Sequence, residues 1–180
     1  LHLLSRRQRQ MCIRDSYRKV TGIPMPIPEI IPVNHFLDNI SLLFKDQKDK
    51  IKIVPATAHL QVIADKGLIE QVLINLMENA LIHSGSTEPV DLIIRELDDA
   101  ISFSVRDYGR GLSEDLLPHI FEGGQVSSGS SDSHRGMGIG LSICQTIIQA
   151  HGGQITAVNH TGDRTKGAEF TFTLPKEKES

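Results

Sequence analysis

The sequence predicts an α/β (α+β) two-layer sandwich, in which a mixed sheet of roughly six strands packs against about three helices. The chain has 180 residues, 39% hydrophobic and 23% charged, which is enough for one domain with its own core. Helical and strand periods follow each other without regular alternation, which favours a mixed sheet. Ile101, Phe103 and Val105 alternate with polar residues, so this strand is expected to have one buried and one wet face.

Residues 1–16 are expected to lie outside the domain. They have no apolar period, and residues 5–16 match one reading frame of a common transposon sequencing adapter. We therefore expect translated adapter sequence, with a basic disordered tail as the alternative. Without this segment the chain has 15 basic and 21 acidic residues, a net charge near −6, which argues against nucleic acid as a partner.

Residues 17–32 are predicted to be a Pro-rich extended linker, residues 33–175 the domain, and residues 176–180 a charged tail. Four prolines between positions 24 and 32 exclude the interior of a helix. A helix is predicted at 33–44 and short strands at 51–54 and 60–63. Asp65 is the predicted N-cap of a long helix that ends at His83, whose apolar stripe has spacings of three and four residues.

The second half of the chain predicts a hairpin, a mobile stretch, a helix and two strands. The hairpin strands are residues 90–97 and 100–106, and residues 116–121 form a short helical turn. The Gly/Ser-rich residues 122–135 are expected to be mobile. A helix then runs from Gly140 to His151, and strands follow at 154–159 and 168–174. No apolar run is long enough for a membrane span, and Cys12 and Cys144 support neither a disulfide nor a metal site, so a cytoplasmic setting is expected.

Two asparagines are the first candidate site residues. Asn75 and Asn79 lie four residues apart on the long predicted helix and therefore share a face. Their side-chain oxygens suit a hard cation such as Mg²⁺, and their amide nitrogens can donate to phosphate oxygens. A solvated pair of surface asparagines is the alternative, and the pair alone does not exclude it.

Asp107 and the two glycines after it are the second candidate. Asp107 extends the inward series 101, 103 and 105 by one step, so a carboxylate is predicted to be buried at a strand end, where it needs a partner. Gly109 and Gly111 let the backbone approach a flat ligand closely. This arrangement suits the amino group of a purine. An acid that merely caps a turn is the alternative.

A third candidate is the alternating glycine run directly before the last predicted helix. Gly136, Gly138 and Gly140 would expose backbone N–H groups where the helix dipole favours anions, which describes a phosphate cradle. No strand leads into the run and no lysine–serine pair follows it. The dinucleotide-binding turn and the Walker motif are therefore excluded.

In this order, the motifs resemble the Bergerat-type ATP-binding domain shared by sensor histidine kinases, gyrase-type ATPases and heat-shock ATPases. The resemblance covers roughly residues 32–175. It rests on residues 68–84 (LIEQVLINLMENALIHS), 107–111 (DYGRG), 120–121, 136–141 and 167–175 (GAEFTFTLP). The sequence segment LIEQVLINLMENA is also similar to the corresponding segment of Kdp-type, potassium-responsive sensor kinases.

The resemblance implies a Mg·ATP site. Asn79 would be the Mg²⁺ ligand and Asn75 would assist at the metal and phosphates, which makes these two the catalytic residues. Asp107 would accept from the adenine amino group. The other implied contacts are His83 at the ribose or base, Gly109 and Gly111 around the adenine, Arg135 at the γ-phosphate, and Gly136, Gly138, Gly140 and Leu141 along the triphosphate.

Position 75 separates the function classes within that family. Gyrase-type ATPases have a glutamate there that activates water, whereas Asn75 accepts no proton at neutral pH, so the phosphoryl group needs a better nucleophile. The resemblance therefore implies the catalytic domain of a two-component protein-histidine kinase. Its partners would be a phosphoacceptor histidine domain and the receiver domain of a response regulator. None of the eight histidines lies in a His-Glu-x-Arg/Lys-Thr-Pro context, so the acceptor helix is expected to be missing and this fragment monomeric.

Two alternatives stay open. An anti-sigma-type serine kinase is suggested by the segment NALIHSG, although those proteins have glutamate where Asn75 stands. A degenerate nucleotide-binding module that acts by interaction alone is suggested by two departures from the family pattern. Ile82 stands where a basic residue is typical, and Gly123 and Gly124 replace a basic residue and a second phenylalanine.

Overall fold

The structure, a computed structural model, describes residues 6–56, 59–122, 133–162 and 166–177. Its main sheet has five strands in the order β2-β4-β5-β7-β6. These are β2 (Ile51–Val54), β4 (Val90–Glu96), β5 (Ala100–Arg106), β7 (Gly167–Pro175) and β6 (Ile155–His160). The β2–β4 pair is parallel and the other three pairs are antiparallel, which confirms the predicted mixed sheet.

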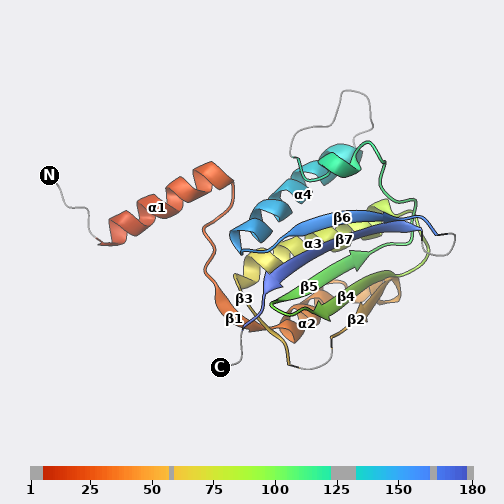
Figure 1. Cartoon of the computed structure of the whole chain (residues 1–180), viewed down its shortest axis with the longest axis horizontal. Coiled ribbons are helices and arrows are strands. Elements are labelled where there is room, and N and C mark those ends of the chain that lie inside the picture. Colours follow the sequence, from red (N-terminus) through yellow and green to blue (C-terminus); the bar gives the residue numbers. More distant parts are fainter. Residues whose placement is uncertain (1–5, 57–58, 123–132, 163–165, 178–180) are drawn as a thin grey trace.

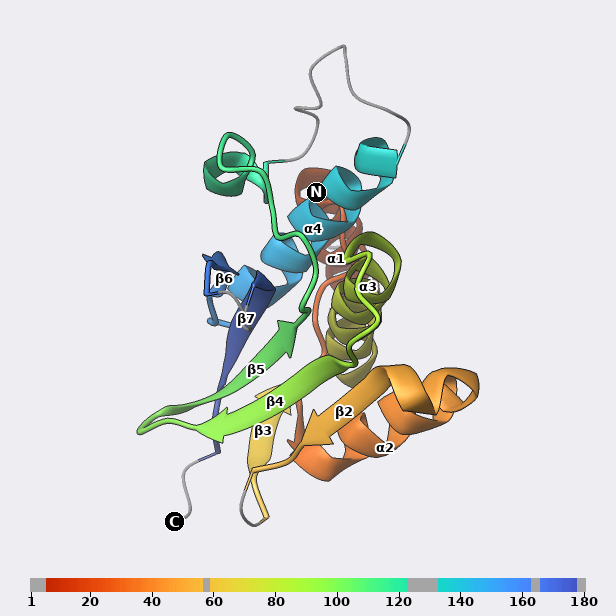
Figure 2. The ribbon, with the colours of Figure 1, turned by 90° about the vertical axis from the view of Figure 1, so that its right-hand side faces the viewer.

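The helices cover one face of this sheet, so the predicted two-layer arrangement is confirmed. Figure 2 shows α3 (Lys66–His83) and α4 (Ser133–Ala150) beside each other to the right of the strands, with α2 (Val33–Leu43) next to β2. A 3-10 helix, η1 (Lys45–Lys50), links α2 to β2. The core between the layers contains stacked Phe103 and Phe172 rings, 4.9 Å apart, with Phe36 edge-on to Phe103 at 6.3 Å.

The long helix α3 begins as the sequence predicts. Asp65 is the N-cap, and its Oδ1 accepts from the backbone N–H of Leu68 at 3.1 Å. The backbone N–H of Asp65 also donates to Nε2 of His151 at 2.9 Å, just past the end of α4. The start of one helix is thereby tied to the end of the other. The predicted apolar stripe is buried, through Ile69, Val72, Leu73, Leu76 and Ala80.

The segment before the domain differs from the prediction. Residues 6–21 form a helix, α1 (Arg6–Thr21), which runs away from the sandwich in Figure 1, and its described side chains are mostly exposed. Disorder of residues 6–16 is therefore wrong for this structure, because this stretch has no Gly or Pro and is rich in Arg and Gln, which favour helix. The expected extended linker holds only for residues 22–28, since β1 (Glu29–Pro32) pairs with β3 (Gln61–Ala64) as a two-stranded ribbon. An adapter origin for residues 1–16 stays a prediction.

The start of α4 also differs. We expected the three glycines to precede the helix, but it begins at Ser133, so Gly136, Gly138 and Gly140 lie inside it. A helix can continue through these three positions, because glycine inside a helix costs only about 1 kcal/mol relative to alanine. In such a helix the N–H groups of Gly138 and Gly140 point to carbonyls one turn earlier, so they do not form a cradle ahead of it.

The remaining predictions about chain organisation are only partly described. A 3-10 turn, η2 (Leu117–His119), lies in the segment expected to be a helical turn. Most of the stretch expected to be mobile, residues 123–132, and residues 178–180 of the predicted charged tail lie outside the described residues. Within the described chain, no helix has the length and apolar character needed to cross a membrane.

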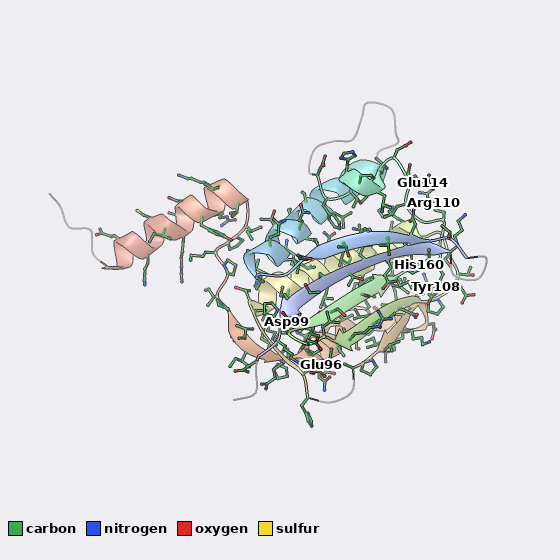
Figure 3. All side chains as sticks on the ribbon, viewed as in Figure 1. Glu96, Asp99, Tyr108, Arg110, Glu114 and His160 are labelled. Carbon is green, nitrogen blue, oxygen red and sulfur yellow. The ribbon has the colours of Figure 1, made fainter. Side chains whose placement is uncertain are left out.

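A row of polar side chains holds the strand ends on the face away from the helices. Arg106 of β5 pairs in register with Asp91 of β4 and Glu169 of β7. The Tyr108 hydroxyl donates to Asp91 Oδ2 at 2.6 Å, and His160 Nε2 lies 2.6 Å from Glu169 Oε2. Figure 3 shows Tyr108 and His160 at the same end of the sheet, opposite the end with Glu96 and Asp99. This row fixes the strands immediately beside Asp107 and Ala168.

The row also shifts the pKa values of two of its side chains, Tyr108 and Glu169. The hydrogen bond to Asp91, with burial, raises the pKa of Tyr108. Burial alone would raise the pKa of Glu169, but hydrogen bonds from His160 and Ser104 and the positive charges of His160 and Arg106 outweigh it, so the pKa is lowered. A carboxyl whose pKa is lower in the folded state stabilises the fold above its ordinary pKa of 4.5, and this contribution is lost as the pH falls through the lower folded value.

Replacing Glu169 by glutamine should therefore weaken the acid sensitivity of the fold. As the pH falls below about 4.5, we expect the free energy of unfolding of the wild type to fall more steeply than that of Glu169→Gln. Urea unfolding at several pH values measures both slopes. Glu88→Gln, at an exposed position, is the matched control and should keep the wild-type slope. Equal slopes for Glu169→Gln and wild type would contradict the assigned shift.

Candidate functional site

A pocket of about 390 Å³ opens between the C-terminal end of α3, the end of β5 and the start of β7. Its volume lies in the range of small-molecule sites. Leu112, Leu116, Ile120, Ala168 and Phe170 form its apolar walls. Its polar lining residues are Asn79, His83, Ser84, Asp107, Arg110 and Ser113. The pocket thus combines flat apolar walls with a few polar groups, as a site for a heterocyclic base requires.

Asp107 is the buried acid of this pocket, with 7% of its surface exposed. Its Oδ1 accepts two backbone N–H groups, from Gly109 at 2.9 Å and from Ala168 at 3.2 Å. These two bonds are the partners that the buried carboxylate needed. The bond to Gly109 is the turn-capping bond of the alternative interpretation, so both interpretations describe part of the geometry. Within the described chain Oδ2 has no hydrogen-bond partner, and it is left to accept from a ligand in the pocket.

Asn79 faces the same pocket and carries an unsatisfied donor. Its Nδ2 is buried and has no hydrogen-bond partner among the described residues. Leaving such a group unpaired costs about 1–3 kcal/mol, so a polar ligand that accepts from it would recover this free energy. His83, one turn further along α3, also lines the pocket, as predicted for a residue near the base.

Asn75 lies in a different hollow. It lines a space of about 420 Å³ between α3 and α4, together with Glu70, Glu78 and Gly140. Its Nδ2 donates to Sγ of Cys144 at 3.2 Å. The structure therefore does not bring the two predicted catalytic asparagines into one pocket, and the role of Asn75 at the phosphates stays a prediction. Burial of the Cys144 thiol raises its pKa to about 11, so it is a neutral neighbour for the amide.

The residues predicted to lie along the triphosphate have different surroundings in the structure. A Cβ on Gly140 would lie 2.5 Å from Asn75 Nδ2, so glycine at this position lets α4 approach α3. Leu141 is fully buried in the core and does not line the pocket. The backbone of Arg135, Gly136 and Gly138 lies in α4, while the side chain of Arg135 lies outside the described part of the chain.

Glycine stands at positions 109 and 111 for different physical reasons. A Cβ on Gly109 would lie 1.9 Å from the carbonyl oxygen of Ser84, so glycine is required because this loop crosses the end of α3. A close approach to a flat ligand, the predicted reason, is not the one that the structure gives for Gly109. Gly111 has a φ of +78° and lines the pocket, so it is both a left-handed turn residue and a pocket residue.

Several pocket residues were not identified from the sequence. Ser84, Arg110, Leu112, Ser113, Leu116, Ala168 and Phe170 belong to this group. Ala168 and Phe170 were detectable, because the alternation along the last strand places them on the inward face. Of the phenylalanine-motif remnant, Ile120 lines the pocket and Phe121 packs edge-on against Phe170 at 6.3 Å. Ile82, which departs from the family pattern, is 70% exposed and is not a pocket residue.

Replacing Gly109 by alanine should disrupt the junction between this loop and α3. The new Cβ meets backbone rather than a movable side chain, so we expect a loss of about 1–3 kcal/mol in the free energy of unfolding. Gly67→Ala is the control, because its Cβ would lie 3.7 Å from Asp65 Oδ1, an ordinary contact, at a helical position. It should stabilise the fold by about 0.5–1 kcal/mol. Urea unfolding of both variants measures the difference, and an unchanged stability of Gly109→Ala would contradict the close approach.

Comparison with known proteins identifies the family. Residues 64–178 match the model described as histidine kinase-, DNA gyrase B-, and HSP90-like ATPase. The sensor protein KdpD of Clostridium acetobutylicum is 42% identical over 147 residues, which are 81% of this chain and 16% of that protein. The chain therefore spans a small part of the length of this relative. This identity agrees with the resemblance to Kdp-type sensor kinases.

Solved structures agree with the sequence match. The catalytic domain of histidine kinase ThkA has a TM-score of 0.68 and 28% identity, and the match covers 83% of this chain and 96% of that one. A structure of ThkA in complex with the response regulator protein TrrA has a TM-score of 0.69 and 26% identity, and the match covers 94% of this chain and 48% of that one. The chain belongs to the histidine kinase, DNA gyrase B and HSP90-like ATPase family, and it is a histidine kinase catalytic domain of the kind found in two-component sensor kinases.

Proposed function

We propose that the domain binds the adenine of ATP in the pocket beside Asp107 and presents the γ-phosphoryl group to a histidine of another domain. The observation that supports this most directly is the anchored carboxylate. Two backbone N–H groups hold Oδ1, and Oδ2 remains as an acceptor at the edge of a largely apolar pocket. An acceptor held in this way suits the amino group of adenine, whereas guanine presents a carbonyl oxygen at the equivalent position.

We propose Asn79 as a ligand of the Mg²⁺ ion that accompanies ATP. Its side chain lines the base pocket, and its Oδ1 is the kind of oxygen that Mg²⁺ prefers. Among the described residues there is no group of three or more His, Cys, Asp or Glu suited to a metal ion. The remaining ligands would therefore be phosphate oxygens and water, which is usual for Mg²⁺ bound with a nucleotide.

The identity of Asn75 supports transfer to a histidine over hydrolysis. Asn75 has no proton-accepting group at neutral pH, and its amide is engaged with Cys144. Glu78 lines the same hollow but is exposed to solvent. When bound, Mg·ATP would supply the phosphoryl group, and the nucleophile would come from the phosphoacceptor domain.

The proposed partners are that phosphoacceptor domain and, after it, the receiver domain of a response regulator. The complex of ThkA with its response regulator supports this sequence of partners by similarity. We place the domain in the cytoplasm, where ATP is available. The anti-sigma-type serine kinase is not favoured, because the similar proteins are histidine kinases. The formed base pocket argues against a degenerate module, since Ile82 lies outside it.

Asp107→Asn should weaken binding of ATP by about 10- to 100-fold, equivalent to roughly 1–3 kcal/mol, because the amide can turn a donor toward the adenine amino group. Titration calorimetry with Mg·ATP and Mg·GTP measures the effect. The wild type should prefer ATP, and the variant should lose most of this preference. Equal affinity of the wild type for ATP and GTP would show that Asp107 does not read the base.

Phosphoryl transfer should depend on an added acceptor. We expect almost no ATP hydrolysis by the domain alone, and labelling of a cognate dimerisation and histidine domain from γ-labelled ATP. The product should be labile in acid and stable in base, as phosphohistidine is. The control is the same acceptor with its histidine replaced by alanine. Rapid hydrolysis without an acceptor, or a base-labile phosphoserine product, would overturn the proposed reaction.

A further inference from the structure

Asn159 is bonded to the wall of the base pocket, although it lies in no motif that marks this family. It stands near the end of β6, the edge strand of the sheet. Its Oδ1 accepts from the backbone N–H of Leu112 at 2.8 Å, and its Nδ2 donates to the carbonyl oxygen of Leu112 at 2.7 Å. A side-chain amide thus pairs with both backbone groups of a single residue, as a neighbouring strand would. We call this pair of bonds the Asn159 clamp.

The clamp acts on a short stretch of loop that has few other attachments. The loop is held earlier by Gly109, whose N–H bonds to Asp107, and by Arg110, whose N–H bonds to Ser84. Within the described chain, the backbone of Leu112 has no other hydrogen-bond partner. Gly111 and Leu112 both line the pocket. The position of this part of the wall therefore depends on the clamp.

Gly111 makes room for the clamp. A Cβ on Gly111 would lie 3.0 Å from Asn159 Oδ1, and the φ of +78° at this residue turns the chain so that Leu112 faces β6. The left-handed glycine and the asparagine are therefore complementary parts of one arrangement.

The clamp is aligned with the acid that faces the ligand. Asn159 pairs in register with Ala168 on β7. Ala168 in turn donates its N–H to Asp107 Oδ1 at 3.2 Å and accepts from the Asp107 N–H at 2.9 Å. Asn159, Ala168 and Asp107 thus form a row across neighbouring segments. The distance between the Leu112 wall and the Asp107 carboxylate is set through this row.

We propose that Asn159 is a positioning residue that fixes the wall formed by Gly111 and Leu112 at a set distance from Asp107, and so determines how strictly the pocket selects a purine with an amino group. The proposal rests on the proposed binding of ATP. A fixed wall keeps the flat base in the position where its amino group can donate to Asp107 Oδ2. A loose wall lets the base shift, so that purines with and without the amino group bind more equally.

Two variants test the clamp itself without any nucleotide. Asn159→Asp keeps the shape but places an oxygen against the Leu112 carbonyl oxygen, and Asn159→Ala removes both bonds without introducing repulsion. Exchange of the Leu112 amide hydrogen, followed by NMR in the nucleotide-free protein, should become faster by at least about tenfold in both. Val158→Thr is the control, because Val158 is 47% exposed on the same strand and keeps a β-branched side chain. An unchanged Leu112 exchange rate in either folded variant would overturn the clamp.

The same variants test selectivity. The ratio of dissociation constants for purine riboside triphosphate, which lacks the 6-amino group, and ATP should be high for the wild type and Val158→Thr. It should fall by at least about threefold in both Asn159 variants, and Asp107→Asn provides the reference for lost selectivity. If a variant only lowered the folded fraction of the protein, the dissociation constants for both nucleotides would rise by the same factor. Their ratio would then stay unchanged. Faster Leu112 exchange with an unchanged ratio would overturn the selectivity role. A wild type that binds neither nucleotide would overturn the proposed function and this role together, while the exchange rates would still decide the clamp.

Discussion

The hydrogen bond from the Ala168 N–H to Asp107 joins the sheet to the ligand pocket, and most of the site depends on it. It forms where β5 ends and β7 begins, so a carboxylate that leaves one strand is held by the backbone of its neighbour. The polar row of Asp91, Arg106 and Glu169 fixes these same strand ends from the opposite face. Because neither strand end is free to shift, a buried charge can be kept at the edge of an apolar pocket with a defined orientation.

Glycines near the site act mainly by allowing backbone segments to meet, rather than by touching a ligand. Gly109 lets the loop after β5 cross the end of α3, and Gly140 lets α4 approach Asn75 on α3. Gly111 is different, since its positive φ turns the loop toward Asn159. The same residue type therefore has two physical roles around the site. In both roles the glycine determines where other groups of the pocket lie.

The sequence predicted the layer arrangement well because it depends on local periodicity. The stripe of α3 and its Asp65 cap depend on residues a few positions apart, and the structure contains both. The alternation in β5 places Ile101, Phe103 and Val105 in the core as predicted. The expected solvent-exposed face of this strand is wrong, because Ser102 and Ser104 are also buried in a central strand of the sheet. The inward direction of Asp107 followed from the same alternation. The partners of Asp107 did not, because Ala168 lies 61 residues away and only strand pairing brings it near. Asn159 was missed for the same reason, since its bonds span 47 residues.

The errors made from the sequence also have physical causes. The alternating glycines predicted a boundary just before α4, but the helix begins at Ser133, and the missing side chain at Gly140 lets it approach Asn75 on α3. Helix α1 was not predicted because it buries almost nothing, and periodicity detects only helices with a buried face. The four-residue spacing of Asn75 and Asn79 predicted a shared face of α3. The structure separates them, because Asn75 contacts Cys144 of α4 while Asn79 lines the base pocket.

That packing gives α3 two separate functional surfaces. Toward the sheet, Asn79 and His83 share a pocket with Asp107, and toward α4, Asn75 lies beside Cys144 and Gly140. In the proposed function, recognition of the base would depend on the first surface, and contact with the phosphates on the second. The first surface is built from α3, the strand ends and the loop held by Asn159. The second also depends on the middle of α4, at Gly140, Ile143 and Cys144, so a shift of α4 would move this hollow while Asp107 and its backbone donors stay in place.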